Sequence, residues 1–310
     1  MLKYALSRIA SSFLVLLAII TITFVLMHAI PGGPFTGEKN IPSGVRKNIE
    51  ERYRLNDPLW QQYRDYLSNL ARFDLGPSFK YPGRSVNDLI AEGFPVSLEL
   101  GLISISLALL VGLPVGAVAA LRQNKWQDYL TMLFATLGVS VPSFVLAALL
   151  IYYLAIRLEL LPAALWEGPE YIVLPALALS AHPMAFIARL TRSSMLEVLA
   201  QDYIKTARAK GLPQFIILYR HAIKNALIPV VSYLGPMAAG ILTGSFIIES
   251  IFAIPGLGRH FVTGIYNRDY TLIMGITIFY SVLVIGLNLL VDLVYPRLDP
   301  RIKLAGKQEE

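Results

Sequence analysis

Cations gather in one polar stretch of the chain, residues 201–229, which is followed by a long apolar run. Its cationic side chains are Lys205, Arg208, Lys210, Arg220, Lys224 and, when protonated, His221. A stretch with this charge cannot lie in lipid, because ionisable side chains are costly in the hydrocarbon core. The chemistry it offers is recognition of an acidic surface, and we expect it to serve as a docking surface in the cytosol.

Local signals in this stretch predict a helix, a tight turn and a second helix. Asp202 is suited to cap the first helix, and the residues after it are good helix formers. Gly211 stands where a helix ends in a left-handed residue. Pro213 is expected to open the second helix at its first position.

No catalytic set accompanies these cations. The chain has no GxxxxGK[ST] phosphate loop, so we expect it not to hydrolyse ATP by that machinery. Its four histidines are too scattered for metal-ligand spacing, and no serine lies in a G-x-S-x-G motif. The absence of cysteine excludes thiol catalysis. We therefore expect a non-catalytic chain without metal or cofactor, whose energy comes from an ion gradient or from a partner.

The composition is that of a membrane protein. Of 310 residues, 55% are hydrophobic and 15% are charged, whereas a soluble domain carries about 25% charged residues. The net charge of +6 does not indicate a nucleic-acid partner. Its cations lie at the edges of apolar runs, as the positive-inside rule describes, rather than on one face of a soluble domain.

Six apolar runs predict an all-α polytopic protein with six transmembrane helices. The expected spans are residues 9–30, 96–121, 129–156, 171–190, 227–250 and 271–295. With both termini in the cytosol, the short inner loops hold most of the Lys and Arg, and the outer ones hold only Arg157, Arg259 and Arg268. This asymmetry predicts cytosolic termini and places the cationic stretch inside.

The runs also divide the chain into expected parts. Residues 1–30 form the first span, 31–95 a small extracytoplasmic insert, 96–296 a core with five spans, and 297–310 a cytosolic tail. The insert is too short to bury much core alone, so we expect it to pack on the membrane domain or on a partner.

Prolines distinguish the middle spans from the outer ones. Pro142 and five other prolines fall within or at the ends of spans two to five, whereas spans one and six have none. Proline frees backbone groups that protein or a wet cavity must satisfy. Spans two to five are therefore interpreted as an inner, moving set braced by the other two, although ordinary kinked packing explains the same pattern.

The cationic stretch resembles a known motif. The run Asp202-Tyr203-x-x-Thr206-Ala207-Arg208-Ala209-Lys210-Gly211, closed by Asn225-Ala226-Leu227-Ile228-Pro229, is similar to the EAA loop of bacterial ABC-importer permeases, in the form of the peptide-permease branch. Lys205 replaces the leading Glu of the general motif, and Gly211 lies further from Pro229 than in that motif. The resemblance implies that a cytosolic loop at about 199–226 couples to ATPase subunits. The implied coupling residues are Asp202, Tyr203, Lys205, Thr206, Ala207, Arg208, Ala209, Lys210 and Gly211. An alternative is a basic amphipathic helix on anionic lipid.

Two further features resemble the same branch. An insert of this size after the first span is typical of the B-type subunit, and residues 34–38 and 76–81 look like the oligopeptide permease. The helix-breaking Pro255-Gly256-Leu257-Gly258 resembles the family's outer loop. We expect it, together with Pro142 and Glu249, to lie on the peptide path, with Glu249 near a span end where it can reach water.

The resemblance implies the fold of a type I ABC-importer permease and the import of oligopeptides. It also implies partners, namely a paralogous C-type permease, two ATPase subunits carrying ATP and Mg, and an extracytoplasmic peptide-binding protein. The expected location is the bacterial inner membrane. A dipeptide, glutathione or nickel permease and a gradient-driven transporter stay open as alternatives. The missing catalytic set opposes an intramembrane enzyme.

Overall fold

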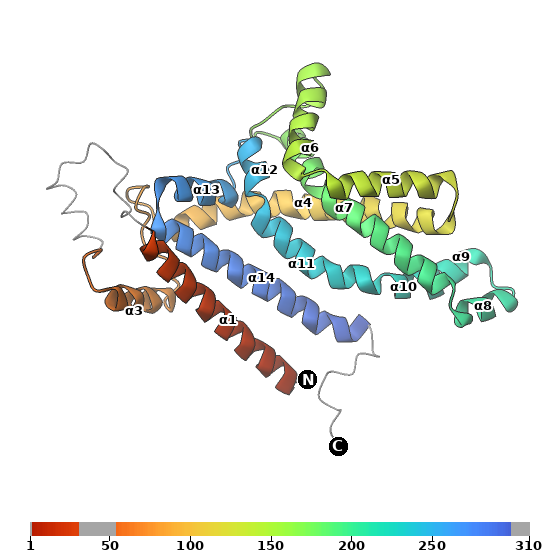
Figure 1. The fold of residues 1–310 in the computed structure, drawn as a ribbon, viewed down its shortest axis with the longest axis horizontal. Coiled ribbons are helices and arrows are strands. Elements are labelled where there is room, and N and C mark those ends of the chain that lie inside the picture. The colour runs from red at the N-terminus through yellow and green to blue at the C-terminus, as the bar shows by residue number, and fades with distance from the viewer. Residues whose placement is uncertain (1, 31–53, 299–310) are drawn as a thin grey trace. The chain divides into compact units, whose positions relative to one another are not determined.

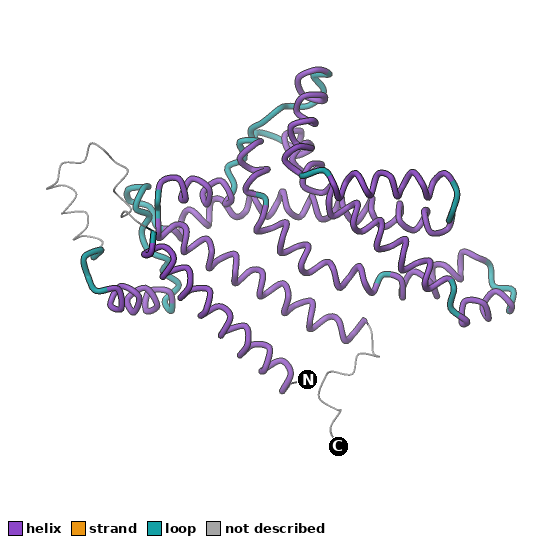
Figure 2. The backbone as a smooth tube through the Cα atoms, viewed as in Figure 1, coloured by secondary structure: helices purple, strands orange, loops and turns teal. Residues whose placement is uncertain are grey.

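The computed structural model describes residues 2–30 and 54–298. Figure 2 shows this part of the chain as helices joined by loops and turns, with an isolated bridge between Pro77 and Ser85. The stretch at residues 34–38 and the tail from residue 299 lie outside the described residues. The predicted all-α class is confirmed.

Five helical segments within the described residues are long and apolar enough to cross a membrane, and a bent pair gives a sixth if it counts as one span. The five are α1 (Leu2–Ala29), α4 (Val86–Leu121), α7 (Pro169–Leu199), α11 (Ile228–Gly244) continued by α12 (Phe246–Ile251), and α14 (Tyr270–Leu298). The bent pair is α5 (Trp126–Ser140) with α6 (Ser143–Leu150), which continues as a π-helical stretch, η1 (Ile151–Arg157).

The third expected span is broken rather than continuous, which corrects the sequence expectation. α5 and the helix that starts at Ser143 meet at 105°, and Figure 1 shows α6 leaving the direction of α5. Val141 is extended, with φ −83° and ψ 120°, and Pro142 follows it. The cause is local, because the residue before a proline is driven out of the helical region.

The second span begins ten residues before the expected Val96, since α4 starts at Val86. A capping box sets this start. The Ser85 hydroxyl accepts the N–H of Asp88 at 3.1 Å, and the Asp88 carboxylate accepts the N–H of Ser85 at 3.0 Å. This Ser-x-x-Asp pattern was visible in the sequence and would have placed the boundary correctly.

The described chain forms two compact units. Unit 1 contains residues 98–254 together with the C-terminal part of α14. Unit 2 contains residues 6–97 and 255–283, and so brings the insert together with most of α1, with α13 (Leu257–Asn267) and with the start of α14. The insert contains the helix α3 (Leu59–Leu70).

A buried carboxylate anchors the insert inside unit 2. Asp269, between α13 and α14, is fully buried and accepts the hydroxyl of Ser78 and the backbone N–H of Phe79 at 3.2 Å. It also accepts the N–H of Leu272 at 3.2 Å and so caps α14. Around this point Val86, Leu257, Leu272 and their neighbours form an apolar core. The described part of the insert thus packs on α13 and α14, which is one of the two arrangements expected from its small size.

Small residues bring α4 close to α7 in unit 1. A Cβ added to Gly112 would lie 2.8 Å from the carbonyl oxygen of Met184, and one added to Gly116 would overlap the carbonyl of Ala188. The Gly112-x-x-x-Gly116 pair therefore allows a close helix contact, as small residues four apart commonly do.

Candidate coupling segment and outer helix break

The candidate coupling segment, residues 199–226 and called the coupling segment below, is built around the short helix α8 (Asp202–Ala209). Gln201 is its N-cap residue, with ψ 149°, and no side chain caps it. The expectation that Asp202 caps the helix is therefore wrong by one position. Asp202 is instead the first helical residue, and it pairs with Lys205 at 2.8 Å. A carboxylate in the first turn still favours the helix dipole.

The C-terminal end of α8 confirms the predicted role of Gly211. This residue has φ +75°. Its N–H donates to the carbonyl of Arg208 at 2.9 Å, and the N–H of Leu212 donates to that of Ala207 at 3.3 Å. These two bonds make a Schellman motif, which requires a left-handed residue at this position.

The second helix starts one residue later than predicted, because Pro213 is the N-cap and Gln214 is the first helical residue. α9 (Gln214–Ile216) continues into a π-helical stretch, η2 (Ile217–Ala222), and then into α10 (Ile223–Ala226). The chain then enters α11. The predicted order of helix, turn and helix is present.

One face of α8 is buried against the segment itself. Ile204 and Ala207 pack with Ile217 and Ala222, and Ala207 is only 7% exposed. The small volume of Ala207 therefore serves the chain's own packing, which corrects the expectation that it fits the surface of a partner. A second small residue, Ala209, is exposed.

The other face of α8 and the turn after it are exposed. The exposed residues are Asp202, Tyr203, Lys205, Thr206, Arg208, Ala209, Lys210 and Gly211. The Tyr203 hydroxyl accepts the side-chain N–H of Asn225 at 2.9 Å, and this bond holds α8 against α10.

Sequence reasoning missed an aromatic pair beside this face. Phe215 and Tyr219 are 74% and 72% exposed, and their rings stack with centroids 6.0 Å apart. Their spacing of four residues on one helix is the signal that could have found them. The open surface of the segment therefore combines cations with exposed rings.

The helix break at Pro255-Gly256-Leu257-Gly258 is confirmed. α12 ends at Ile251, and Gly256 is the N-cap of α13. The N–H of Leu257 donates to the Ser97 hydroxyl at 2.9 Å. A Cβ on Gly93 would lie 3.0 Å from the Leu257 nitrogen, so α4 and this corner touch through backbone.

The expected pathway residues are divided between the two compact units. Pro142 and Glu249 belong to unit 1, whereas Pro255, Gly256 and Gly258 belong to unit 2.

Glu249 does not reach water from a span end, which corrects the expectation. It has no exposed surface, and its carboxylate accepts the hydroxyl of Ser245 one turn earlier on the chain. A buried carboxylate inside a membrane domain is costly unless it is hydrogen-bonded.

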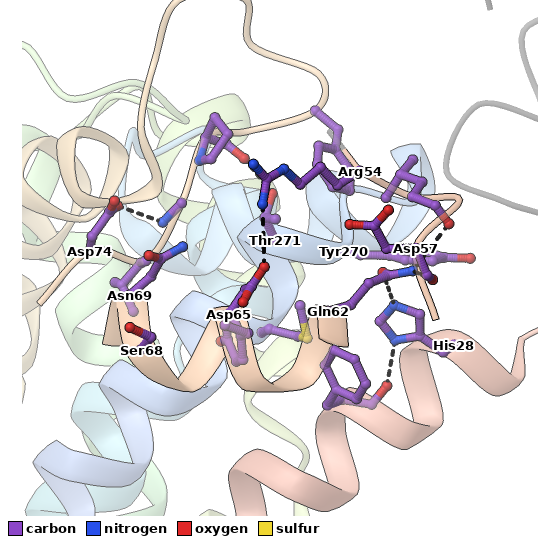
Figure 3. Close-up of a pocket in the computed structure, with 18 residues that line it drawn as sticks. His28, Arg54, Asp57, Gln62, Asp65, Ser68, Asn69, Asp74, Tyr270 and Thr271 are labelled. Atoms are coloured by element: carbon purple, nitrogen blue, oxygen red, sulfur yellow. Dashed lines mark hydrogen bonds and ion pairs between the residues drawn. The ribbon is translucent and has the colours of Figure 1, made fainter. Parts of the chain in front are cut away.

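Unit 2 contains a polar pocket that the sequence did not predict (Figure 3). Its cavity volume is about 470 Å³, and it lies among the end of α1, α3 and the start of α14. The charged and amide side chains on its walls are His28, Arg54, Asp57, Gln62, Asp65, Asn69 and Asp74. Arg54 approaches Asp65 at 3.5 Å. Burial raises the pKa of the pocket's Tyr66 phenol above its usual range.

His28 joins the end of α1 to α3 at this pocket. One ring nitrogen lies 2.8 Å from the Phe24 carbonyl oxygen and the other 3.3 Å from the Gln62 side-chain oxygen. The Gln62 amide nitrogen donates to the carbonyls of Leu55 and Asp57, which fixes its orientation. Among the residues that the structure describes, no three His, Asp or Glu side chains form a metal-type cluster.

Comparison with known families decides the class of this protein. Residues 112–304 match the family described as "Binding-protein-dependent transport system inner membrane component", and residues 1–101 match its N-terminal counterpart. The chain belongs to this family of inner membrane components. Its predicted resemblance to ABC-importer permeases is thereby confirmed, and the gradient-driven alternative loses its support.

Two relatives match this inner membrane component over nearly its whole length. The dipeptide transport system permease protein DppB of Bacillus subtilis (strain 168) is 54% identical over 99% of this chain and 100% of its own. The oligopeptide transport system permease protein OppB of Salmonella typhimurium (strain LT2) is 49% identical over 98% of this chain and 100% of its own.

A solved structure supports the fold. A chain of the MetNI methionine ABC transporter, in an inward-facing conformation, superposes with a TM-score of 0.55 at 19% identity. The match covers 68% of this inner membrane component and 96% of that chain. The expected type I importer fold is therefore confirmed for the covered part.

Proposed function

We propose that this permease subunit carries peptides across the bacterial inner membrane into the cytosol. The observation that carries the proposal is the similarity, over almost the full chain, to permeases of a dipeptide and an oligopeptide system. We assign oligopeptides as the substrate class and keep dipeptides as the alternative, because relatives of both kinds match this chain.

The chain forms half of the translocation pathway in this proposal. A paralogous C-type permease supplies the other half, and an extracytoplasmic binding protein delivers the peptide. Two ATPase subunits bind ATP and Mg and hydrolyse the ATP, while this chain carries out no catalysis. Because a peptide is large, a cavity lined by two permease subunits accommodates it better than a path within the helix bundle of one subunit.

The coupling segment is proposed as the contact with one ATPase subunit. α8 is short, ends sharply at Gly211, and exposes Lys205, Arg208 and Lys210. These cations suit acidic residues on a partner. We propose that the membrane helices move at two points, the broken span at Pro142 and the helix break at Pro255. They move there when the transporter switches between its outward- and inward-facing states.

The proposed topology places both termini in the cytosol and the insert outside. Asn56 is exposed in unit 2, and the chain contains no cysteine. In intact cells the variant Asn56→Cys should react with a membrane-impermeant thiol reagent, whereas Gly211→Cys should react only after the cells are opened. The reverse pattern would invert the topology.

An uptake assay tests the function. A strain lacking this gene should lose uptake of labelled tetrapeptides and pentapeptides and regain it with the plasmid-borne gene. Purification through this chain should also retain an ATPase. Restored uptake of dipeptides alone would assign the alternative substrate, and restored uptake without any ATPase in the complex would refute the ATP-driven assignment.

A further inference from the structure

A buried ion pair joins the first turn of α5 to α7 within unit 1. Asp128 is 2% exposed, and its carboxylate accepts both the Nε–H and the Nη2–H of Arg192, the latter at 2.7 Å. The Arg192 side chain is itself only 23% exposed. Two parallel bonds of this kind fix the angle between the partners as well as their distance.

The same carboxylate holds the turn between α4 and α5. Asp128 accepts the backbone N–H of Asn124 at 3.0 Å, and Asn124 takes a left-handed conformation with φ +60°. One carboxylate therefore connects three places: the α4–α5 turn, the start of α5, and Arg192 in the C-terminal half of α7. A helix with only apolar contacts can slide along its neighbour, but this pair sets the register of α5 against α7.

The two helices lie side by side beyond the ion pair. A Cβ on Gly138 of α5 would lie 2.8 Å from the Cβ of Ala185 on α7, so the contact extends toward the end of α5. There Val141 and Pro142 begin the 105° bend into α6. α5 thus runs from the ion pair to the break in the third span.

The other end of α7 leads into the coupling segment. α7 ends at Leu199 and α8 begins at Asp202. Val198 and Leu199 pack against the buried face of α8 at Ile204 and its neighbours. A displacement of α8 therefore acts directly on α7.

We infer that Asp128 and Arg192 form a brace that makes α5 follow α7, and so carries movement of the coupling segment to the bend at Pro142. This inference rests on the proposed function, in which an ATPase moves that segment. Both residues are positioning residues, because neither lies in the proposed ATPase contact. Separating the two residues would leave a buried charge uncompensated, which is costly. The pair therefore stays intact while the helices move.

The brace makes a different prediction from a bond that only stabilises the fold. If the pair merely stabilises, its loss lowers the amount of complex, and each surviving complex hydrolyses the usual amount of ATP per peptide. If it transmits movement, assembled complexes hydrolyse ATP without moving peptide. The number of ATP molecules hydrolysed per peptide imported separates the two roles.

The test uses the complete transporter, purified with its partner subunits and reconstituted in vesicles. Arg192→Gln and Asp128→Asn keep polar side chains of similar size but remove one charge each. Each should raise the ATP hydrolysed per imported peptide about tenfold, which is a usual size for coupling between sites. The double variant should be no worse than either single one, because both changes remove the same pair.

A matched control lies one turn away on the same helix. Arg189 is exposed, and within the described part of the chain its side chain bonds only Thr136, at 3.4 Å. Arg189→Gln should therefore leave the ratio unchanged. Arg192→Lys should give an intermediate ratio, since a lysine keeps the positive charge but cannot donate two parallel hydrogen bonds to the carboxylate. A normal ratio in Arg192→Gln, or an equal rise in Arg189→Gln, would overturn the brace.

A chemical tether gives an independent measurement. The chain has no cysteine, so the variant Asp128→Cys/Arg192→Cys can be joined by a short reagent that reacts with two thiols. The untethered variant should be uncoupled, and tethering should restore uptake. If tethering abolishes the uptake that the untethered variant retains, α5 and α7 must separate during transport and the inference is wrong. Failure of the unaltered complex to import peptide would instead refute the proposed function.

Discussion

Gly211→Val should lower peptide uptake about tenfold or more while leaving the chain inserted in the membrane. Gly211 has φ +75°, and a Cβ placed on it would meet nothing within 4 Å. The cost of a side chain is therefore conformational rather than steric. A left-handed conformation costs an L-residue about 1–2 kcal/mol, and a β-branched side chain fits it worst. Without this conformation the Schellman bonds to Arg208 and Ala207 are lost, and α8 no longer ends where the proposed ATPase contact needs it.

A series of variants at this position separates conformation from contact. Asparagine tolerates the left-handed region, so Gly211→Asn should keep most of the uptake, and Gly211→Ala should fall between Asn and Val. ATPase retention during purification should follow the same order. If Gly211→Val keeps normal uptake and a bound ATPase, the end of α8 does not transmit force. If Asn is as damaging as Val, Gly211 is itself part of the contact surface.

Ala207→Glu should abolish uptake by destroying the coupling segment from within. Ala207 is packed against Ile204 and Ile217 in the segment's small core, and a carboxylate there would be buried without a partner. Burying an unpaired charged group costs several kcal/mol, more than a short helix can offset. Limited proteolysis of the permease, purified without ATPase, should show new cleavage around α8, and uptake should fall to background.

The neighbouring Ala209 provides the matched control. It lies on the exposed side of α8, so Ala209→Glu should leave the proteolytic pattern unchanged. Ala209→Trp should also fold normally, but it should release the ATPase if this face is the docking surface. If Ala207→Glu keeps the proteolytic pattern of the unaltered chain but loses the ATPase, Ala207 contacts the partner. That result would contradict its buried position.

Features that depend on near neighbours in the chain were predictable from the residues. The apolar runs, each long enough to cross a hydrocarbon core, indicated the spans and the all-α class. Gly211 marked the end of α8, because the sign of φ there depends on the missing Cβ. The helix break at Pro255-Gly256 was predictable for a similar reason, since proline and glycine act on the backbone locally. The Ser85-x-x-Asp88 box belongs to the same class of signals, although it was overlooked.

Features that depend on distant contacts were not predictable. Asp128 and Arg192 are 64 positions apart, and Ser78 and Asp269 are 191 apart. No periodicity or spacing indicates that such residues meet. Whether Ala207 or Ala209 faces inward depended on where the second helix of the segment packs, which is a property of the folded hairpin. The sequence by itself therefore determined the membrane class, the approximate positions of the apolar spans and the C-terminal end of α8, because these follow from local hydrophobicity and backbone conformation. Only the tertiary structure decided which side chains are buried and paired, because burial is produced by residues that the chain brings together from far apart.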